Sequence, residues 1–286
     1  MSAARTDAPA SSPHPPATGS APPSVDAAAS SSHPATAGSA ATGAPASVAA
    51  TATTDAARPD AAAAEAALAT LDAAWRARRS IRAFRPEPLP RETLAGLFEA
   101  AQRAPSWCNV QPWRVVVTEP PRTAEVAAAL QAAARSGFPQ PEVPFPLDYP
   151  PPYKEHRIAC GKALYQAMGV ARDDKAGRYD AWLRNYALFD APHVAVVSCD
   201  RRLGPYAYVD VGVWLGYLLS AAALLGIDTC PMASVAAYPA PLRSLLPIAD
   251  TDAILFGLTL GRADEGAPAN ACRTTREPAA ANVTFV

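Results

Sequence analysis

The distribution of apolar residues divides the chain before any motif is considered. From Met1 to about Ala64 there is no Leu, Ile, Phe, Tyr or Trp, and the residues are almost all Ala, Pro, Ser, Thr or Gly. Such a segment cannot bury enough apolar surface to offset its conformational entropy, so we predict a disordered tail over residues 1–64. Residues 65–286 are numerous enough to form one domain with a full core.

Two helices are predicted near the start of this domain. Asp60 precedes an alanine-rich run that ends in arginines, which is the charge order that a capped helix favours. A second helix is expected between Pro90 and Pro105, because its apolar residues recur on one helical face: Leu94, Leu97, Phe98 and Ala101.

An uncharged apolar run from Val211 to Ile227 raises the question of a membrane span. Its length lies at the lower limit for crossing a bilayer, and its small residues suit close helix packing within a protein. We therefore predict a buried helix, and no membrane partner.

Four β-branched or apolar runs predict strands, at Trp113–Thr118, His193–Cys199, Asp228–Met232 and Ala253–Gly261. They do not alternate with helices regularly enough for a doubly wound sheet, so the expected class is α+β. Prolines exclude regular structure from Ser136 to Tyr153, and the length of this segment predicts a lid or an excursion over a partner subunit.

Charge and cysteine content exclude several partners and sites. The formal net charge is -1, so no basic field attracts nucleic acid or an anionic membrane surface. The five cysteines include no C-x-x-C pair, which argues against a disulfide framework or a zinc site and favours reduced thiols in the cytoplasm. The N-terminus has no apolar signal region; translation from a downstream start codon is an alternative explanation of the tail.

Motifs for familiar catalytic chemistry are absent from the sequence. There is no G-x-G-x-x-G after a strand, no G-x-S-x-G and no Walker A loop. The predicted domain contains only His156 and His193, so neither a metal site nor a Ser-His-Asp triad is indicated, and His193 at the start of an apolar strand is interpreted as structural. The chemistry is therefore expected to belong to a bound cofactor.

The segment Arg78–Phe84, RRSIRAF, concentrates three arginines and a serine at a predicted helix end. Guanidinium groups bind phosphate in a bidentate way, and a serine hydroxyl adds another donor. Taken alone, the cluster is better explained as a charged helix end that faces solvent.

Other motifs follow the arginine cluster in a recognisable order. They are APSWCNVQPWRVVV at Ala104–Val117, LLGIDTCPMAS at Leu224–Ser234 and NACRTTREP at Asn270–Pro278. This set resembles the FMN-dependent nitroreductase family over about residues 75–286, and is most similar to the longer bacterial members that act on nitroaromatics. The resemblance implies a nitroreductase-like fold, with a central, mostly antiparallel sheet flanked by helices, in an intertwined homodimer.

The same resemblance implies where FMN would bind. Arg78 would lie near the phosphate and Arg82 near the N1/C2-carbonyl edge of the ring, where a cation stabilises the charge of the reduced flavin. Asn185 would bind the pyrimidine edge of the flavin, and the Pro231–Ser234 loop would lie against N5 and O4. In this loop Ala233 and Ser234 replace the Glu-Gly of many members. The complete set of implied cofactor-binding residues is Arg78, Arg79, Ser80, Arg82, Pro105, Ser106, Asn109, Asn185, Met232, Ala233, Ser234, Arg273 and Arg276.

Three of these assignments have structural alternatives. Pro105, Ser106 and Asn109 would come from the partner subunit, but the segment could instead be a turn whose tryptophans simply pack. Asn185 could be a helix-end residue, and Arg273 a surface charge.

The implied activity is reduction of a nitroaromatic or quinone-type acceptor by NADPH or NADH in a ping-pong cycle. A reductive dehalogenase or a flavin-consuming enzyme of the same family is a second hypothesis. A non-catalytic flavin-binding protein is a third.

Overall fold

Four strands form one antiparallel sheet in the computed structural model, which describes residues 58–286. They are β1 (Arg114–Val117), β2 (His193–Asp200), β3 (Asp228–Met232) and β4 (Asp252–Gly261), in the order β1-β2-β4-β3 across the sheet. Each strand coincides with a predicted one to within one residue at either end. The α+β class with a central antiparallel sheet is confirmed.

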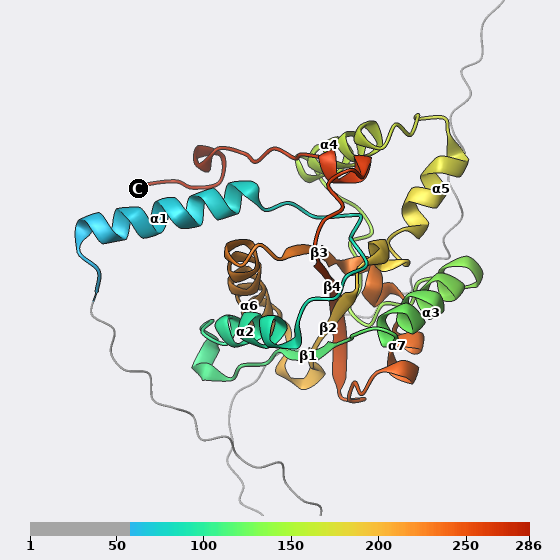
Figure 1. Cartoon of the computed structure of the whole chain (residues 1–286), viewed down its shortest axis with the longest axis horizontal. Helices are drawn as coiled ribbons and strands as arrows, with labels where there is room; N and C mark the ends of the chain where they lie inside the picture. Colours follow the sequence, from blue (N-terminus) through green and yellow to red (C-terminus); the bar gives the residue numbers. More distant parts are fainter. Residues whose placement is uncertain (1–57) are drawn as a thin grey trace, which may run out of the picture. The chain divides into compact units, whose positions relative to one another are not determined.

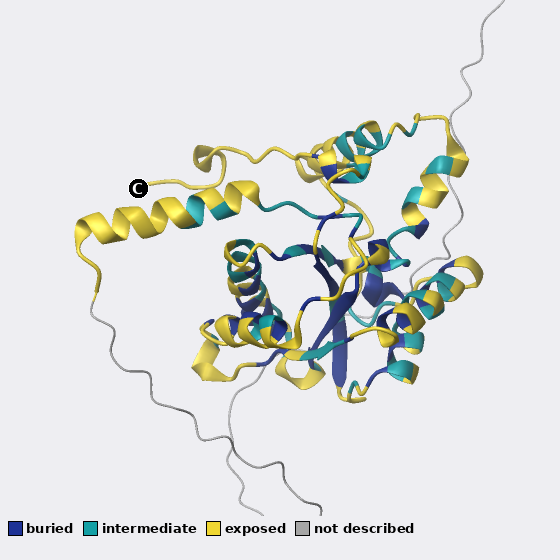
Figure 2. Cartoon of the chain, viewed as in Figure 1, coloured by how far each residue is buried: buried dark blue, intermediate teal, exposed yellow. Residues whose placement is uncertain are grey.

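Side chains of the central strands β2 and β4 contribute to the apolar core on both faces of the sheet. Side chains alternate along a strand, so Val194 and Val196 belong to one apolar cluster, and Ala195 and Val197 to the other. Every residue of β2 from His193 to Cys199 is buried, which explains why its sequence is a continuous apolar run rather than an alternating one. Figure 2 shows these two strands in dark blue.

Helices cover the two faces of the sheet (Figure 1). On one face α2 (Arg91–Ala101) packs against α6 (Pro205–Leu224), and α6 also contacts α1 (Ala61–Ala77). On the other face lie α3 (Arg122–Ser136) and α7 (Pro239–Leu245), whose buried residues join the first cluster.

Helix α1 begins where the sequence predicts. The Asp60 carboxylate accepts a hydrogen bond from the Ala63 backbone N–H at 2.8 Å and so caps the helix. The tail predicted over residues 1–64 lies outside the described residues as far as residue 57, and its residues 61–64 form the first turn of α1. None of α1 is buried, and the Trp75 indole N–H ties it to α6 by donating to Ser220 Oγ at 2.9 Å.

Helix α6 is buried on one face only, which corrects the prediction of a buried helix. It is long and apolar enough to cross a membrane by length and composition, but Val211, Trp214 and Leu218 pack in the core. Val209 and Tyr217 are exposed on the other side, by 61% and 45%. An apolar helix whose second face is uncovered has a surface suited to another chain.

Helices α4 (Tyr153–Ala167) and α5 (Lys175–Leu183) were not predicted. They follow residues 137–152, which contain no helix or strand, as the prolines require. Glu142 anchors that segment by accepting a hydrogen bond from the Ile254 N–H at 2.8 Å and by pairing with Arg201 and Arg243.

Short 3-10 turns complete the described chain: η1 (Trp107–Asn109), η2 (Leu188–Asp190), η3 (Arg201–Leu203), η4 (Ala233–Ala237), η5 (Pro268–Ala271) and η6 (Ala279–Ala281).

The buried His193 is structural, as predicted. Its Nε2 accepts the Leu89 N–H at 2.9 Å, so its Nδ1 carries the proton and donates to the Thr118 carbonyl at 3.0 Å.

Candidate functional site

The arginine segment runs along the outer edge of β3. Ser80 forms a parallel bridge with Thr229, and the Ile81 N–H donates to the Thr229 carbonyl at 3.0 Å. Ile81 and Phe84 are buried in the core, at 0% and 5% exposure, so they fix the backbone, while the three arginines and the serine of the segment remain half-buried. The sequence RRSIRAF thus anchors a set of donors at a sheet edge.

Three of these donors act electrostatically on one buried thiol. Burial raises the pKa of Cys230, while the Arg82 guanidinium, the Ser80 hydroxyl and the Arg78 guanidinium act against that rise. Arg78, Ser80 and Arg82 therefore lie within electrostatic reach of the same point on β3. In the part of the chain that the structure describes, neither Arg78 nor Arg82 forms an ion pair.

Asn270 holds this segment in place, although the sequence analysis assigned it no role. Its side chain is 3% exposed. Its Oδ1 accepts the Arg82 backbone N–H at 2.7 Å, and its Nδ2 donates to the carbonyls of Ala83 and Asp264 at 2.8 and 2.9 Å. A buried amide with its donors and acceptor paired in this way specifies one arrangement of the segments it joins.

The Asn270 backbone carbonyl accepts hydrogen bonds from two further residues that were predicted to bind FMN. It accepts Arg79 Nε at 3.1 Å and an Arg273 guanidinium N–H at 2.8 Å. Arg79 also pairs with Glu265 at 2.8 Å, and the Glu265 side chain is 74% exposed. Arg79 and Arg273 thus lie together, held by the chain itself.

Arg276 lies apart from this group. It is exposed, and its guanidinium donates to Thr274 Oγ1 and the Thr275 carbonyl, both within two residues of it. Among the described residues no hydrogen bond joins it to the arginine segment.

The loop after β3 contains an unsatisfied hydroxyl. Met232 is buried, and η4 continues into buried residues that pack against β4. Within the described residues Ser234 Oγ is buried without a hydrogen-bond partner, and such a group is costly unless a ligand or water satisfies it. Two guanidinium groups without counter-charges and the Ser80 hydroxyl lie at the edge of β3, and the Ser234 hydroxyl lies in the loop that follows this strand. Donors of this kind fit a phosphorylated molecule rich in acceptors, such as FMN.

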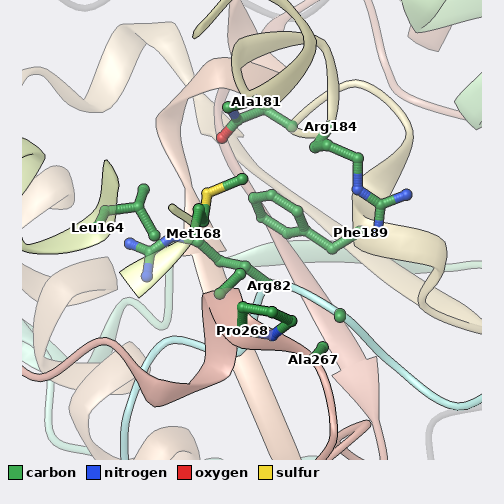
Figure 3. A pocket seen from close by; sticks show the side chains of 11 residues that line it. Arg82, Leu164, Met168, Ala181, Arg184, Phe189, Ala267 and Pro268 are labelled. Carbon is green, nitrogen blue, oxygen red and sulfur yellow. The ribbon is translucent and has the colours of Figure 1, made fainter. Parts of the chain in front are cut away.

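Arg82 and Asn185 line one cavity of about 320 Å³ (Figure 3). The Asn185 amide nitrogen donates to the Trp182 carbonyl at 2.9 Å, so the amide orientation is set by its own helix end. The remaining lining is largely apolar: Ala83, Leu164, Met168, Ala181, Arg184, Phe189, Ala267, Pro268 and Ala269. The cavity is suited to the edge of a planar ring.

The cavity wall includes a backbone of rare conformation. Leu188, Phe189 and Asp190 have φ of 53°, 55° and 61°, in the left-handed region that bulky residues avoid. Phe189 is buried, and its carbonyl accepts the Phe84 N–H at 3.1 Å, which links this turn to the arginine segment. Strained non-glycine turns concentrate at functional sites.

Pro105, Ser106 and Asn109 lie elsewhere. In Figure 1 the loop between α2 and β1 is at the lower left, whereas the segment after α1 crosses the upper centre. Ser106 Oγ accepts the Gln111 N–H at 2.9 Å, and the Trp107 N–H donates to Asp210 on α6 at 3.1 Å. A single copy of the chain therefore does not bring this loop to the arginines.

Comparison with known proteins identifies related chains. The family model described as "Nitroreductase family" matches residues 75–262. A 4-nitrobenzoate reductase of Pseudomonas putida is 33% identical over 209 residues, covering 73% of this chain and 92% of that protein. A 4-nitrobenzoate reductase of Nocardioides sp. is 34% identical over 220 residues, covering 75% and 89%.

A solved structure gives the same result for the fold. The FMN and NADPH-dependent nitroreductase NfnB from Sphigopyxis sp. strain HMH superimposes with a TM-score of 0.72 and 37% identity, covering 76% of this chain and 98% of that one.

Proposed function

Because this chain belongs to the nitroreductase family, we propose that it is an FMN-dependent oxidoreductase that uses NADPH or NADH to reduce nitroaromatic or quinone-type acceptors. The observation that carries the proposal is the uncompensated donor set of Arg78, Ser80, Arg82 and Ser234 around β3. The similarity to two 4-nitrobenzoate reductases and to an FMN and NADPH-dependent nitroreductase supports the choice of cofactor and acceptor.

The phosphate end of FMN would be held by arginines. Arg78 supplies a guanidinium without a counter-charge, and Arg273 is fixed beside the segment through the Asn270 carbonyl. Arg79 pairs with an exposed carboxylate, and such a pair is weak enough for a phosphate to replace it. Arg276 is exposed, and in the described chain it is bonded only to Thr274 and Thr275, so its guanidinium is available to a phosphate.

The ring of FMN would be oriented by Arg82 and Asn185 at its pyrimidine edge, since both line the same cavity. Met232, Ala233 and Ser234 would lie against N5 and O4 of the ring, with the Ser234 hydroxyl as a donor. Bound FMN supplies reversible two-electron transfer, which permits a ping-pong cycle in which the nicotinamide leaves before the acceptor enters. The Arg82 cation would stabilise negative charge near the ring, so the protein would need few acids or bases.

A homodimer is part of this proposal. Ser106 and Asn109 lie away from the arginines of their own chain, and a second copy could bring them to the site. The exposed apolar face of α6, with Val209 at 61% and Val213 at 38% exposure, offers a surface on which such a copy would pack. We also place the enzyme in the cytoplasm, where its five free thiols would stay reduced.

An absorbance spectrum of the purified protein tests the function. We expect flavin bands that bleach when NADPH or NADH is added without oxygen, and that return when 4-nitrobenzoate or a quinone follows. Arg82→Gln should lose FMN, whereas Arg122→Gln, which removes an exposed arginine from a surface pair, should retain it.

Other results would replace the proposal. A colourless protein that neither binds added FMN nor oxidises NAD(P)H would refute it. Flavin that stays oxidised with NAD(P)H would indicate a non-catalytic flavin-binding protein. Release of halide from a halogenated aromatic, or loss of the flavin itself, would indicate one of the alternative enzymes.

A further inference from the structure

The loop between α2 and β1 has a backbone that its own residues do not favour. Cys108, Asn109 and Gln111 have φ of 49°, 55° and 48°, and none of them is glycine. L-residues avoid this left-handed region because Cβ approaches the carbonyl oxygen, although asparagine tolerates it better than most. Three such residues within four positions need contacts that hold them there.

Some of these contacts come from within the loop. Ser106 Oγ accepts the Gln111 N–H at 2.9 Å, and the Gln111 side-chain amide donates to the Asn109 carbonyl at 3.1 Å. These bonds define the shape of the loop. They do not fix its position on the domain, because all of them lie within the loop.

Contacts with the rest of the domain come from β1, where Arg114 donates to the Gln111 carbonyl at 3.4 Å, and from the first turns of α6. The Asp210 carboxylate, in a residue 8% exposed, accepts the Trp107 N–H at 3.1 Å. One turn earlier, Tyr206 meets the Trp107 ring edge-on, with centroids 4.9 Å apart and planes at 74°. Tyr206 and Asp210 are four residues apart and so share a face of the helix.

We propose that Asp210, assisted by Tyr206, is a positioning residue for FMN binding, because it clamps the Ser106–Gln111 loop to α6 in the shape that presents Ser106 and Asn109 to the flavin of the partner subunit. This inference rests on the proposed function. It adds a pair of residues that touch neither FMN nor substrate. A hydrogen bond to an ionised carboxylate is stronger than one to a neutral acceptor, which suits a clamp on an unfavourable backbone.

FMN affinity of the cofactor-depleted full chain tests the clamp. We expect Asp210→Ala to raise the dissociation constant for FMN at least about tenfold, as loss of one charge-assisted hydrogen bond would. Asp210→Asn keeps an acceptor oxygen, so it should restore most of the affinity. Ser220→Ala is the matched control, since it removes the hydrogen bond of α6 with Trp75 and should leave FMN affinity unchanged.

A double-mutant cycle with Asn109→Ala separates positioning from general stability. If Asp210 acts through the loop, Asp210→Ala should add little to the loss already caused by Asn109→Ala. If it acts on the fold as a whole, the two fold-changes should multiply. Sedimentation at the same protein concentration should show an unchanged molecular mass for Asp210→Ala.

Tyr206→Leu keeps the test open if Asp210→Ala does not fold, because the tyrosine is 64% exposed. It should weaken FMN binding several-fold, as loss of an aromatic pair would. Unchanged affinity in both Asp210→Ala and Tyr206→Leu, multiplying fold-changes, or a loss that follows dissociation to monomers would each overturn the clamp alone. A wild-type chain that binds no FMN would overturn the proposed function, and the clamp with it.

Discussion

Replacing Asn270 by alanine tests most directly which hydrogen bonds hold the arginine segment of the candidate site in place. Asn270→Ala removes three hydrogen bonds, with the Arg82 N–H and the carbonyls of Ala83 and Asp264, while the Asn270 backbone carbonyl remains. The substitution therefore removes the side-chain hydrogen bonds of Asn270, including the one with the Arg82 N–H. It leaves the hydrogen bonds that Arg79 and Arg273 donate to the Asn270 backbone carbonyl.

The expected loss of stability follows from those three bonds. Leaving a buried polar group unpaired costs about 1–3 kcal/mol. Ala267 and Ala269 line the neighbouring cavity, which gives water a route to the freed groups, so the lower end of that range applies. Three groups at about 1 kcal/mol each give about 3 kcal/mol, which would lower Tm by roughly 6–12 °C in a domain of this size.

Thermal unfolding of the cofactor-free protein at one fixed concentration measures this loss. Asn282→Ala is the control, because Asn282 is exposed and its side chain forms no hydrogen bond within the described chain. Asn270→Asp should lose at least as much as Asn270→Ala, since its carboxylate still accepts the Arg82 N–H but places a buried anionic oxygen against the two carbonyl oxygens. A Tm for Asn270→Ala within about 2 °C of wild type would refute this account of the tie.

Three further predictions follow from single positions. Ser234→Ala should raise the Tm of the cofactor-free protein slightly, because it removes a buried hydroxyl without a partner, yet weaken FMN binding in a titration; a loss of both would contradict the proposed role. Gly257→Ala should lower Tm, because a Cβ there would lie 2.7 Å from a Val235 methyl, whereas Gly96→Ala in α2 has open space and should stabilise by about 0.5–1 kcal/mol. Burial would raise the pKa of Glu142, but hydrogen bonds from a backbone N–H and two guanidinium groups lower it overall. The stability from this lowered pKa is present above the unfolded value of about 4.3 and is lost as pH falls through the folded value. Glu142→Gln should therefore reduce Tm at pH 7, with a smaller difference near pH 3; an equal difference at both would refute the ionic origin.

Where a pattern reflects burial, the sequence predicts the fold closely. The four strands are visible because β-branched and apolar residues are concentrated in short runs, and α2 because its apolar residues recur on one face. Helix α4 has no buried residue and α5 only Leu183, so neither leaves an apolar stripe for periodicity to detect. Their formation depends on local preference and on packing over a cavity that no single-sequence pattern encodes.

Some residues of the candidate site could be predicted from the sequence and others could not. The arginine segment and the β3 loop could be selected from motif order, and the structure places them on adjoining elements. Asn270 and Asp210 were missed because their importance comes from backbone groups far away in the sequence, which residue identity does not reveal. The left-handed residues Leu188 and Phe189 gave no signal either, since glycine or asparagine normally marks such positions.

Different faces of helix α6 contact different parts of the molecule, and each face therefore needs different side chains. Trp214 and Leu218 must be apolar to complete the core, and Val209 and Val213 stay apolar where the described chain leaves them exposed. Asp210 interrupts this apolar sequence, and a buried carboxylate is unfavourable unless it has a specific partner. That partner is the Trp107 N–H of a loop with three left-handed residues. The carboxylate adds nothing to the apolar core, so we attribute its presence on this helix to the shape that it imposes on the loop.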